Sequence, residues 1–253
     1  MAVSGIMNEI RQAEFAAYLP QAGAAAGDCV YPCAIAAGIQ SGRIFTDGLT
    51  VLFWHHCGFA YLSGKPGSAF LQALLPFFRI PARRFVLITD DRSVQAFFAE
   101  QAGFEQSDRI YYRAEQPAPV PMLPEGFSLR KTDAALLHEL TGRIIPAFSW
   151  ESPEQFFANG FGYCVMHGKE IAASAFSAAV TSDAVDIGVE TADGFRRRGL
   201  ATIAAAAVMQ ETASQGKTAV WAHHAQNTGS MKTAQALGFQ PERICKTIIR
   251  TPD

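Results

Sequence analysis

The feature that most restricts the fold of this chain is a strand-like run that leads through a basic, glycine-containing turn into an alanine-rich helix. The run covers residues 184–191, the turn reads Arg-Arg-Arg-Gly over 196–199, and the helix is expected over 200–214, before Gly216. Free N–H groups at a helix start, together with the helix dipole, attract anions. The pattern therefore predicts a mixed α/β protein with an anion site where the strand gives way to the helix.

The residue types in this turn suit a pyrophosphate. Gly199 and Ala201 leave the backbone uncovered so that a phosphate can approach it, and Arg196, Arg197 and Arg198 add positive charge on the same side. The alternative is that the arginines belong to a surface loop and that the small residues let the helix pack closely on a sheet.

The composition fits a compact globular protein. Of the 253 residues 49% are hydrophobic and 17% are charged, and the net charge of -2 gives no overall attraction to nucleic acid or to an acidic membrane surface. No run of about 18 apolar residues predicts a membrane span. Five scattered cysteines without a CxxC pair argue against disulfides and zinc, and the charged N-terminus argues against a signal peptide. We therefore expect a cytoplasmic protein.

Four prolines within residues 116–126 indicate a linker. We expect an N-terminal α/β domain at 1–116, the linker at 117–126 and a second domain at 127–253. Strands are expected at residues 49–53, 59–62, 85–89, 109–113, 127–130, 162–166, 171–180, 184–191, 218–222 and 243–249. Helices are expected at residues 8–19, 68–78, 93–102, 134–143, 200–214 and 230–237.

The two halves share a local pattern. A strand, a helix that begins with serine, a Gly-Phe pair and a further strand follow residue 85, and the same order follows residue 219. The pattern fits a duplicated fold in which only the second copy kept its ligand site. The alternative is that Gly-Phe is a common helix C-cap with its hydrophobic contact.

The motifs resemble those of the GNAT N-acetyltransferase superfamily. The spacing Arg196-x-x-Gly199-x-Ala201 matches its Arg/Gln-x-x-Gly-x-Gly/Ala turn, and residues 227–239 (NTGSMKTAQALGF) resemble its Asn-x-x-Ser helix that ends in Leu-Gly-Phe. The likeness covers residues 126–249. Within the superfamily the chain is similar to the zwittermicin-resistance-type acetyltransferases, on the runs 156–165 (FFANGFGYCV), 187–191 (IGVET) and 198–202 (RGLAT), and on Trp221.

The resemblance implies a mixed central GNAT sheet flanked by helices in the C-terminal half, with the N-terminal α/β half as a degenerate GNAT-like repeat. It also implies binding of acetyl-CoA as co-substrate without a metal. The backbone of Val189 and Thr191 would then bind the pantetheine arm, and Asn227 and Ser230 would meet the pantetheine or the acyl end. The pyrophosphate would lie on the N–H groups of Arg197, Arg198, Gly199, Leu200, Ala201 and Thr202, with Arg196 beside it.

The chemistry requires a proton acceptor for the attacking amine. Asp186 and Glu190 lie four apart on the strand, hence on one face with Gly188, and either could be the general base. A water relay through His224 is a third route. The alternative for each acid is a charge at the sheet edge or a hydrogen bond to a loop.

Two further residues are candidates for the substrate side. Trp150 could line an amine pocket by cation–π contact or could pack in the core, and His224 could face the substrate or be half-buried. A departure from the superfamily lies seven residues after Asn227, where many members carry a tyrosine that protonates the leaving thiolate and this chain has Ala234. Ser230, water or no acid at all would then serve.

The function expected is direct transfer of an acetyl group from acetyl-CoA to an amine of a small molecule. The alternatives are a CoA-binding sensor or scaffold without turnover, and an enzyme that acetylates proteins. No nucleic-acid or membrane partner is expected, and both a monomer and a homodimer fit the sequence.

Overall fold

The computed structural model describes residues 6–81 and 83–251, which form two compact units. One unit has the bounds Met1–Ile110 and Arg243–Asp253, and the other covers Tyr111–Glu242. Two long strands, β6 (Phe104–Arg113) and β12 (Gln240–Arg250), each begin in one unit and end in the other. Among the described residues no helix is both long and apolar enough to cross a membrane.

The first unit is a sheet with helices on both faces. Its strands lie in the order β1-β2-β3-β4-β5-β12, followed by the first part of β6. The elements are β1 (Asn8–Glu9), the 3-10 helix η1 (Gln12–Tyr18), α1 (Leu19–Gly23), α2 (Val30–Ala36), β2 (Gly42–Thr46), β3 (Val51–His55), β4 (Phe59–Ser63), α3 (Ser68–Leu74), η2 (Leu75–Arg79), β5 (Val86–Thr89) and α4 (Arg92–Ala99).

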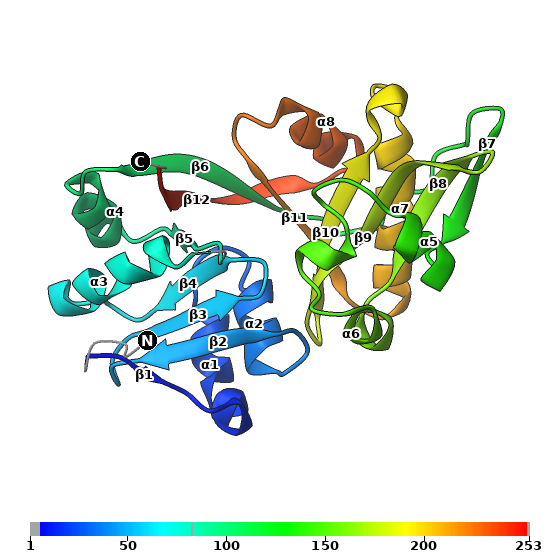
Figure 1. Cartoon of the computed structure of the whole chain (residues 1–253). Helices are drawn as coiled ribbons and strands as arrows, with labels where there is room; N and C mark the ends of the chain where they lie inside the picture. Colours follow the sequence, from blue (N-terminus) through cyan, green and yellow to red (C-terminus); the bar gives the residue numbers. More distant parts are fainter. Residues whose placement is uncertain (1–5, 82, 252–253) are drawn as a thin grey trace. The chain divides into compact units, whose positions relative to one another are not determined.

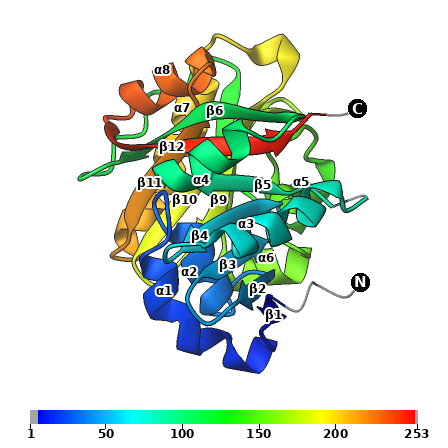
Figure 2. The same ribbon diagram turned by 90° about the vertical axis from the view of Figure 1, so that its left-hand side faces the viewer.

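Alternation along β3 divides the core of this unit into two layers. Leu52 and Trp54 point to a cluster with α3 and α4, whereas Val51 and Phe53 point to a cluster with α1 and α2. Figure 2 views the unit from the side of α3 and α4. All five residues of β3 are buried because both faces of the strand are covered by helices.

The second unit contains the remaining strands of the sheet. Its strands lie in the order β11-β10-β9-β8-β7, with the end of β6 beside β11, and α7 packs along β8 to β11 (Figure 1). The elements are β7 (Phe127–Lys131), α5 (Ala134–Glu139), η3 (Pro146–Phe148), α6 (Pro153–Asn159), β8 (Gly162–His167), β9 (Glu170–Val180), β10 (Ala184–Thr191), η4 (Asp193–Phe195), α7 (Leu200–Ser214), β11 (Thr218–His224) and α8 (Thr228–Ala236).

The two units follow the same plan. In each, an edge strand is followed by helices, an antiparallel three-strand run, a helix, a parallel strand, a second helix and a long last strand. The two long last strands, β6 and β12, reach strands of the other half of the chain. β12 follows α8 in the chain but pairs with β5, and the segment after β6 bonds to β11 through Ala114 N–H and Ala219 O at 3.2 Å. The shared plan supports the predicted GNAT-like repeat.

Most elements predicted from the sequence are confirmed, above all in the second unit. The strands at 162–166, 171–180 and 184–191 are β8, β9 and β10, and the helix at 200–214 is α7. The linker residues 117–124 have no regular structure. Because β12 groups with the first unit, these units differ from the expected division at 1–116 and 127–253, which stays a prediction about functional domains.

Two expectations in the first unit need correction, and two elements of this unit were not predicted. Residues 8–19 are not one α-helix but a short strand and a 3-10 helix. The strand expected at 49–53 begins two residues later, because Thr46, Asp47 and Thr50 close a tight turn through side-chain hydrogen bonds. The unassigned stretch 24–39 contains α2, and β2 was not predicted.

Candidate cofactor and acceptor site

The site is built where two parallel neighbours, β10 and β11, stop pairing. Residues 184–186 of β10 pair in register with 218–220 of β11, and the pairing ends there although both strands continue. β10 keeps its antiparallel pairing with β9 as far as Thr191, with a bulge opposite Asp186 and Ile187. The far ends of β10 and β11 therefore leave backbone groups that the sheet does not use.

The direction of these backbone groups follows from strand alternation. The N–H of Ala192 donates to Ala172 O of β9 at 3.0 Å. Alternate residues point their N–H groups to opposite edges, so those of Val189 and Thr191 point away from β9, to the side of β11. These are the two residues that the sequence singled out for contact with an extended ligand.

The turn before α7 has an unusual backbone. Arg197 has φ +63 and Gly199 has φ +75, both in the left-handed region, which glycine adopts freely and arginine rarely does. The first described bond of the helix runs from Ile203 N–H to Gly199 O at 3.3 Å. Within the described chain, no backbone acceptor takes up the N–H groups of residues 197–202, and residues 196–199 are exposed. The amides predicted to hold a phosphate are therefore open.

The three arginines of the turn have different surroundings. Arg196 pairs with Asp193 at 2.8 Å, and its Nε lies 3.5 Å from Thr191 O. Arg198 lies over the ring of Phe195, 5.5 Å from its centroid. These contacts hold two of the guanidinium groups against the loop.

Helix α8 begins beside the unpaired end of β11. The side-chain oxygen of Asn227 caps the helix by accepting the N–H of Ser230 at 3.0 Å. The Ser230 hydroxyl in turn accepts the indole N–H of Trp221 at 2.9 Å. Among residues 6–81 and 83–251, no acceptor takes up the amide N–H₂ of Asn227 or the hydrogen of the Ser230 hydroxyl. Ala234, one turn further on, is fully buried.

The two candidate bases, Asp186 and Glu190, lie on one face of β10. The Glu190 carboxylate accepts the backbone N–H groups of Arg143 at 3.0 Å and Ile144 at 2.9 Å, both through Oε2. Its Oε1 has no hydrogen bond among the described residues. Asp186 is buried, at 4% exposure. A Cβ at Gly188, between them, would touch Ile144 and Phe176, so all three face the loop that follows α5.

His224 lies on the same face. Asp186 pairs with Val220, so register places Val220, Ala222 and His224 on the side of Asp186 and Glu190. The ring is half-buried, and its Nδ1 accepts the N–H of Gln226 at 3.4 Å, which leaves the hydrogen on Nε2.

Trp150 lies in the core. It is 2% exposed, its indole N–H donates to Ser177 O at 2.8 Å, and its ring packs against Phe156. This placement corresponds to the packing alternative and leaves no open ring face for a cation, so Trp150 is not kept as a substrate contact.

Two contacts of this region were not foreseen. The loop at 142–144 holds Glu190, and Ile144 is 46 residues away from it in sequence, so no local signal indicated the contact. Tyr112, at the end of β6, forms a hydrogen bond to His223, which the sequence offered only as a neighbour of His224.

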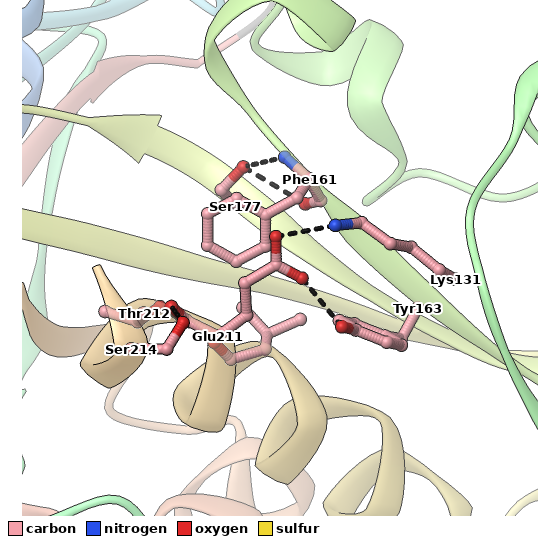
Figure 3. A network of polar contacts seen from close by, with 8 residues as sticks. Lys131, Phe161, Tyr163, Ser177, Glu211, Thr212 and Ser214 are labelled. Carbon is pink, nitrogen blue, oxygen red and sulfur yellow. Dashed lines mark hydrogen bonds and ion pairs between the residues drawn. The ribbon is translucent and has the colours of Figure 1, made fainter.

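A polar network ties α7 to the edge of the sheet (Figure 3). Glu211 of α7 accepts the ammonium of Lys131 and the hydroxyl of Tyr163, each at 2.7 Å. Burial and the neighbouring carboxylate raise the pKa of Tyr163 to about 12. The network ties the C-terminal end of α7 to β7 and β8. Among residues 6–81 and 83–251, no group of three or more His, Cys, Asp or Glu side chains could hold a metal.

These features define an α/β protein in which β10 and β11 diverge beside an exposed basic turn before α7, and solved structures share the fold. A GCN5-related N-acetyltransferase-like protein from Streptococcus suis 89/1591 matches with a TM-score of 0.76 at 20% identity, over 95% of this chain and 100% of that one. A tandem GNAT protein from the clavulanic acid biosynthesis pathway matches with a TM-score of 0.54 at 14% identity, over 84% of this chain and 83% of that one.

A family model described as GNAT acetyltransferase matches residues 26–247, so the chain belongs to the GNAT acetyltransferase family. A curated relative, an uncharacterized N-acetyltransferase YdfB from Bacillus subtilis (strain 168), is 26% identical over 120 residues. That match covers 47% of this chain and 46% of the relative, so the two share about half of their lengths.

Proposed function

We propose that the protein transfers an acetyl group from acetyl-CoA directly to an amine of a small molecule. The observation that carries this proposal is the set of open N–H groups at residues 197–202, at the start of a buried helix and beside the unpaired end of β10. A left-handed residue next to ordinary backbone turns successive N–H groups toward one point, which favours an anion such as a pyrophosphate.

The residues present fit the rest of the cofactor. The N–H groups of Val189 and Thr191 point to the unpaired side of β10 and would bind the pantetheine amides. Asn227 and Ser230 keep donors free beside the end of β11 and would meet the pantetheine or the acyl end. Arg196, Arg197 and Arg198 supply positive charge around the pyrophosphate.

Proton removal from the amine is assigned to the face that carries the two acids. Glu190 is held by two backbone donors through one oxygen, which leaves Oε1 to accept a proton from the amine directly or through water. Asp186 is the alternative base, and a water relay through His224 is the third route. The neutral amine then attacks the thioester carbonyl carbon, whose oxygen would accept a hydrogen bond from a backbone N–H near Val189.

Within the family we propose that the protein belongs to the zwittermicin-resistance-type subgroup, because its sequence resembles that subgroup at residues 156–165, 187–191 and 198–202. We accordingly propose a small aminated metabolite or antibiotic as acceptor, and a cytoplasmic protein without a metal. A release assay for free CoA across polyamines, amino acids and aminated antibiotics identifies the acceptor. If no amine in the panel causes release of CoA although acetyl-CoA binds tightly, the alternative of a CoA-binding sensor is favoured. Ala234, in place of the tyrosine that many members carry, is the residue that suggests this alternative.

The cofactor placement is tested with two matched glycines. Gly199 and Gly216 lie at opposite ends of α7, both have positive φ, and a Cβ at either would meet nothing within 4 Å. Gly199→Val and Gly216→Val therefore introduce similar backbone strain. We expect calorimetry to show at least about tenfold weaker acetyl-CoA binding for Gly199→Val only, because its side chain would cover the phosphate site. Equal affinities in the two variants would disprove the placement.

A further inference from the structure

The loop that binds Glu190 carries an arginine, and the position of this arginine bears on the kind of amine that the site accepts. Arg143 and Ile144 donate their backbone N–H groups to Glu190 Oε2, at 3.0 and 2.9 Å. Because the backbone makes both bonds, they hold the main chain of Arg143 beside the first candidate base without using its side chain.

The loop lies directly against the face of β10 that carries the two acids. A Cβ at Gly142 would be 2.7 Å from Glu190 Cγ and 3.1 Å from its Oε2, and Gly142 has φ +119, so the close approach depends on glycine. A Cβ at Gly188 would lie 3.2 Å from Ile144 Cγ2. Arg143 is the middle residue of the three that lie against this face.

The guanidinium of Arg143 is available to a ligand. Arg143 is exposed, and within the part of the chain that the structure describes its guanidinium forms no ion pair and no hydrogen bond. Arg196 differs, because it pairs with Asp193 at 2.8 Å. The Glu190 carboxylate bonds to the main chain of Arg143 and not to its guanidinium. The positive charge next to the candidate base therefore stays open to an anionic group.

We propose that Arg143 selects acceptors in which the amine lies next to a carboxylate, as in an α-amino acid; this rests on the proposed acetyl transfer. The amine of such an acceptor lies at Glu190, whose Oε1 has no hydrogen bond among the described residues. Its carboxylate binds the guanidinium, whose parallel N–H donors match two carboxylate oxygens. No bond forms or breaks at Arg143, so this residue determines specificity and is not catalytic.

The same charges disfavour the other amines. The second ammonium group of a polyamine meets the guanidinium as a like charge, which weakens binding. An amine with a neutral substituent gains nothing from the guanidinium. Discrimination therefore has an attractive part, the carboxylate pair, and a repulsive part against a second cation.

The test compares acceptors that differ only in the carboxylate, with the whole 253-residue chain and saturating acetyl-CoA. The twenty standard amino acids and spermidine are screened for CoA release. The best amino acid is then compared with its amino alcohol, in which CH₂OH replaces the carboxylate and the amine keeps a similar basicity. We expect the wild type to show a kcat/KM about 10–100-fold higher for the amino acid.

Three variants assign this preference to one side chain. Arg143→Met keeps an unbranched stem and both backbone bonds to Glu190 but removes the charge. The preference should then disappear through loss of activity on the amino acid alone, with unchanged kcat/KM for the amino alcohol and unchanged acetyl-CoA affinity. Arg143→Lys keeps the charge without the paired donors and should retain part of the preference. Arg92→Met, at an exposed arginine of α4, is the matched control and should change neither value.

The outcomes separate specificity from activity. Faster acetylation of spermidine or of the amino alcohol than of any amino acid would overturn the role of Arg143, and so would a preference that persists in Arg143→Met. In both cases acetyl transfer still stands. Equal losses for both acceptors in Arg143→Met would show a merely structural role and would also overturn the proposal. If the wild type transfers acetyl to no amine, the proposed function itself fails, and the specificity fails with it.

Discussion

The carboxylate of Glu190 accepts the backbone N–H of Ile144 at 2.9 Å, which joins the end of β10 to a loop 46 residues earlier in the chain. The same oxygen accepts the N–H of Arg143. One side chain thus shapes the loop beside the expected acceptor position and is also the first candidate for the base. The two roles are separable, because an amide oxygen can replace the carboxylate as acceptor but cannot take up a proton.

Glu190→Gln should therefore inactivate without unfolding. The glutamine oxygen keeps both backbone bonds, so the melting temperature should remain near that of the wild type. Removing the base should lower kcat by about 10²–10⁴-fold. Steady-state kinetics and thermal unfolding measure the two effects, with Glu170→Gln at an exposed position of β9 as control. If Asp186→Asn shows the large loss and Glu190→Gln does not, the base is Asp186.

Trp150→Phe should affect stability rather than substrate binding. The change removes the indole donor from the buried Ser177 carbonyl, which costs about 1–3 kcal/mol in the free energy of unfolding. Denaturant unfolding and the KM for the amine are the two measurements, with Phe157→Leu at a partly exposed site as control. A raised KM for the amine at unchanged stability would restore Trp150 to the substrate site.

The network at Glu211 makes stability depend on alkaline pH. The pKa of Tyr163 is raised to about 12 from an ordinary value of 10.0, so the unfolded chain releases this proton first. Its contribution to stability is complete below pH 10 and is lost as the pH rises toward 12. Tyr163→Phe should lose less stability over that interval than the wild type. Cys29 and Cys245, whose pKa values are also raised by burial, are present in both proteins. Parallel curves would refute the assignment.

His55 makes the free energy of unfolding depend on acidic pH. Burial lowers its pKa to about 3 from 6.5, and its Nδ1 accepts the Cys57 N–H at 3.1 Å. Its contribution to stability is complete above pH 6.5 and is lost as the pH falls toward 3, at about 1.4 kcal/mol per pH unit. His55→Asn keeps an acceptor but does not titrate, so its stability should vary less between pH 6.5 and 4.5.

The acid interval isolates this histidine from the carboxylates. Glu9 and Asp91 also have lowered pKa values, but the ordinary pKa values of these groups, 4.5 and 3.8, place their effect at lower pH. An unfolding free energy of His55→Asn that falls as steeply as that of the wild type above pH 4.5 would assign the acid sensitivity to another group.

The site was predictable where its signals are local. The turn at 196–199, the helix at 200–214 and the helix at 230–237 each depend on residues close in sequence, and the structure has all three, the last as α8 with Asn227 as its cap. Contacts between distant segments were not predictable. No sequence pattern at 142–144 indicates that this loop binds Glu190. Likewise, none indicates that Tyr112 forms a hydrogen bond to His223. Such contacts depend on the register of the sheet.

The strand exchange shows the same limit at the level of the fold. The sequence predicted a strand at 243–249 but assigned it to the second domain, since helix α8 precedes it directly. Pairing with β5, through residues such as Thr247 and Ile88, depends on which sheet edge is open, and that information is not local.

That exchange also bears on biosynthesis. Without β12 the edge of β5 lacks this strand partner, and β12 follows all the other described strands of the sheet along the chain. The first unit would therefore expose the unpaired edge of β5 until residues 240–250 have been synthesised. A chain that is cut before residue 240 would lack β12, so the edge of β5 in the first unit would stay without this strand partner.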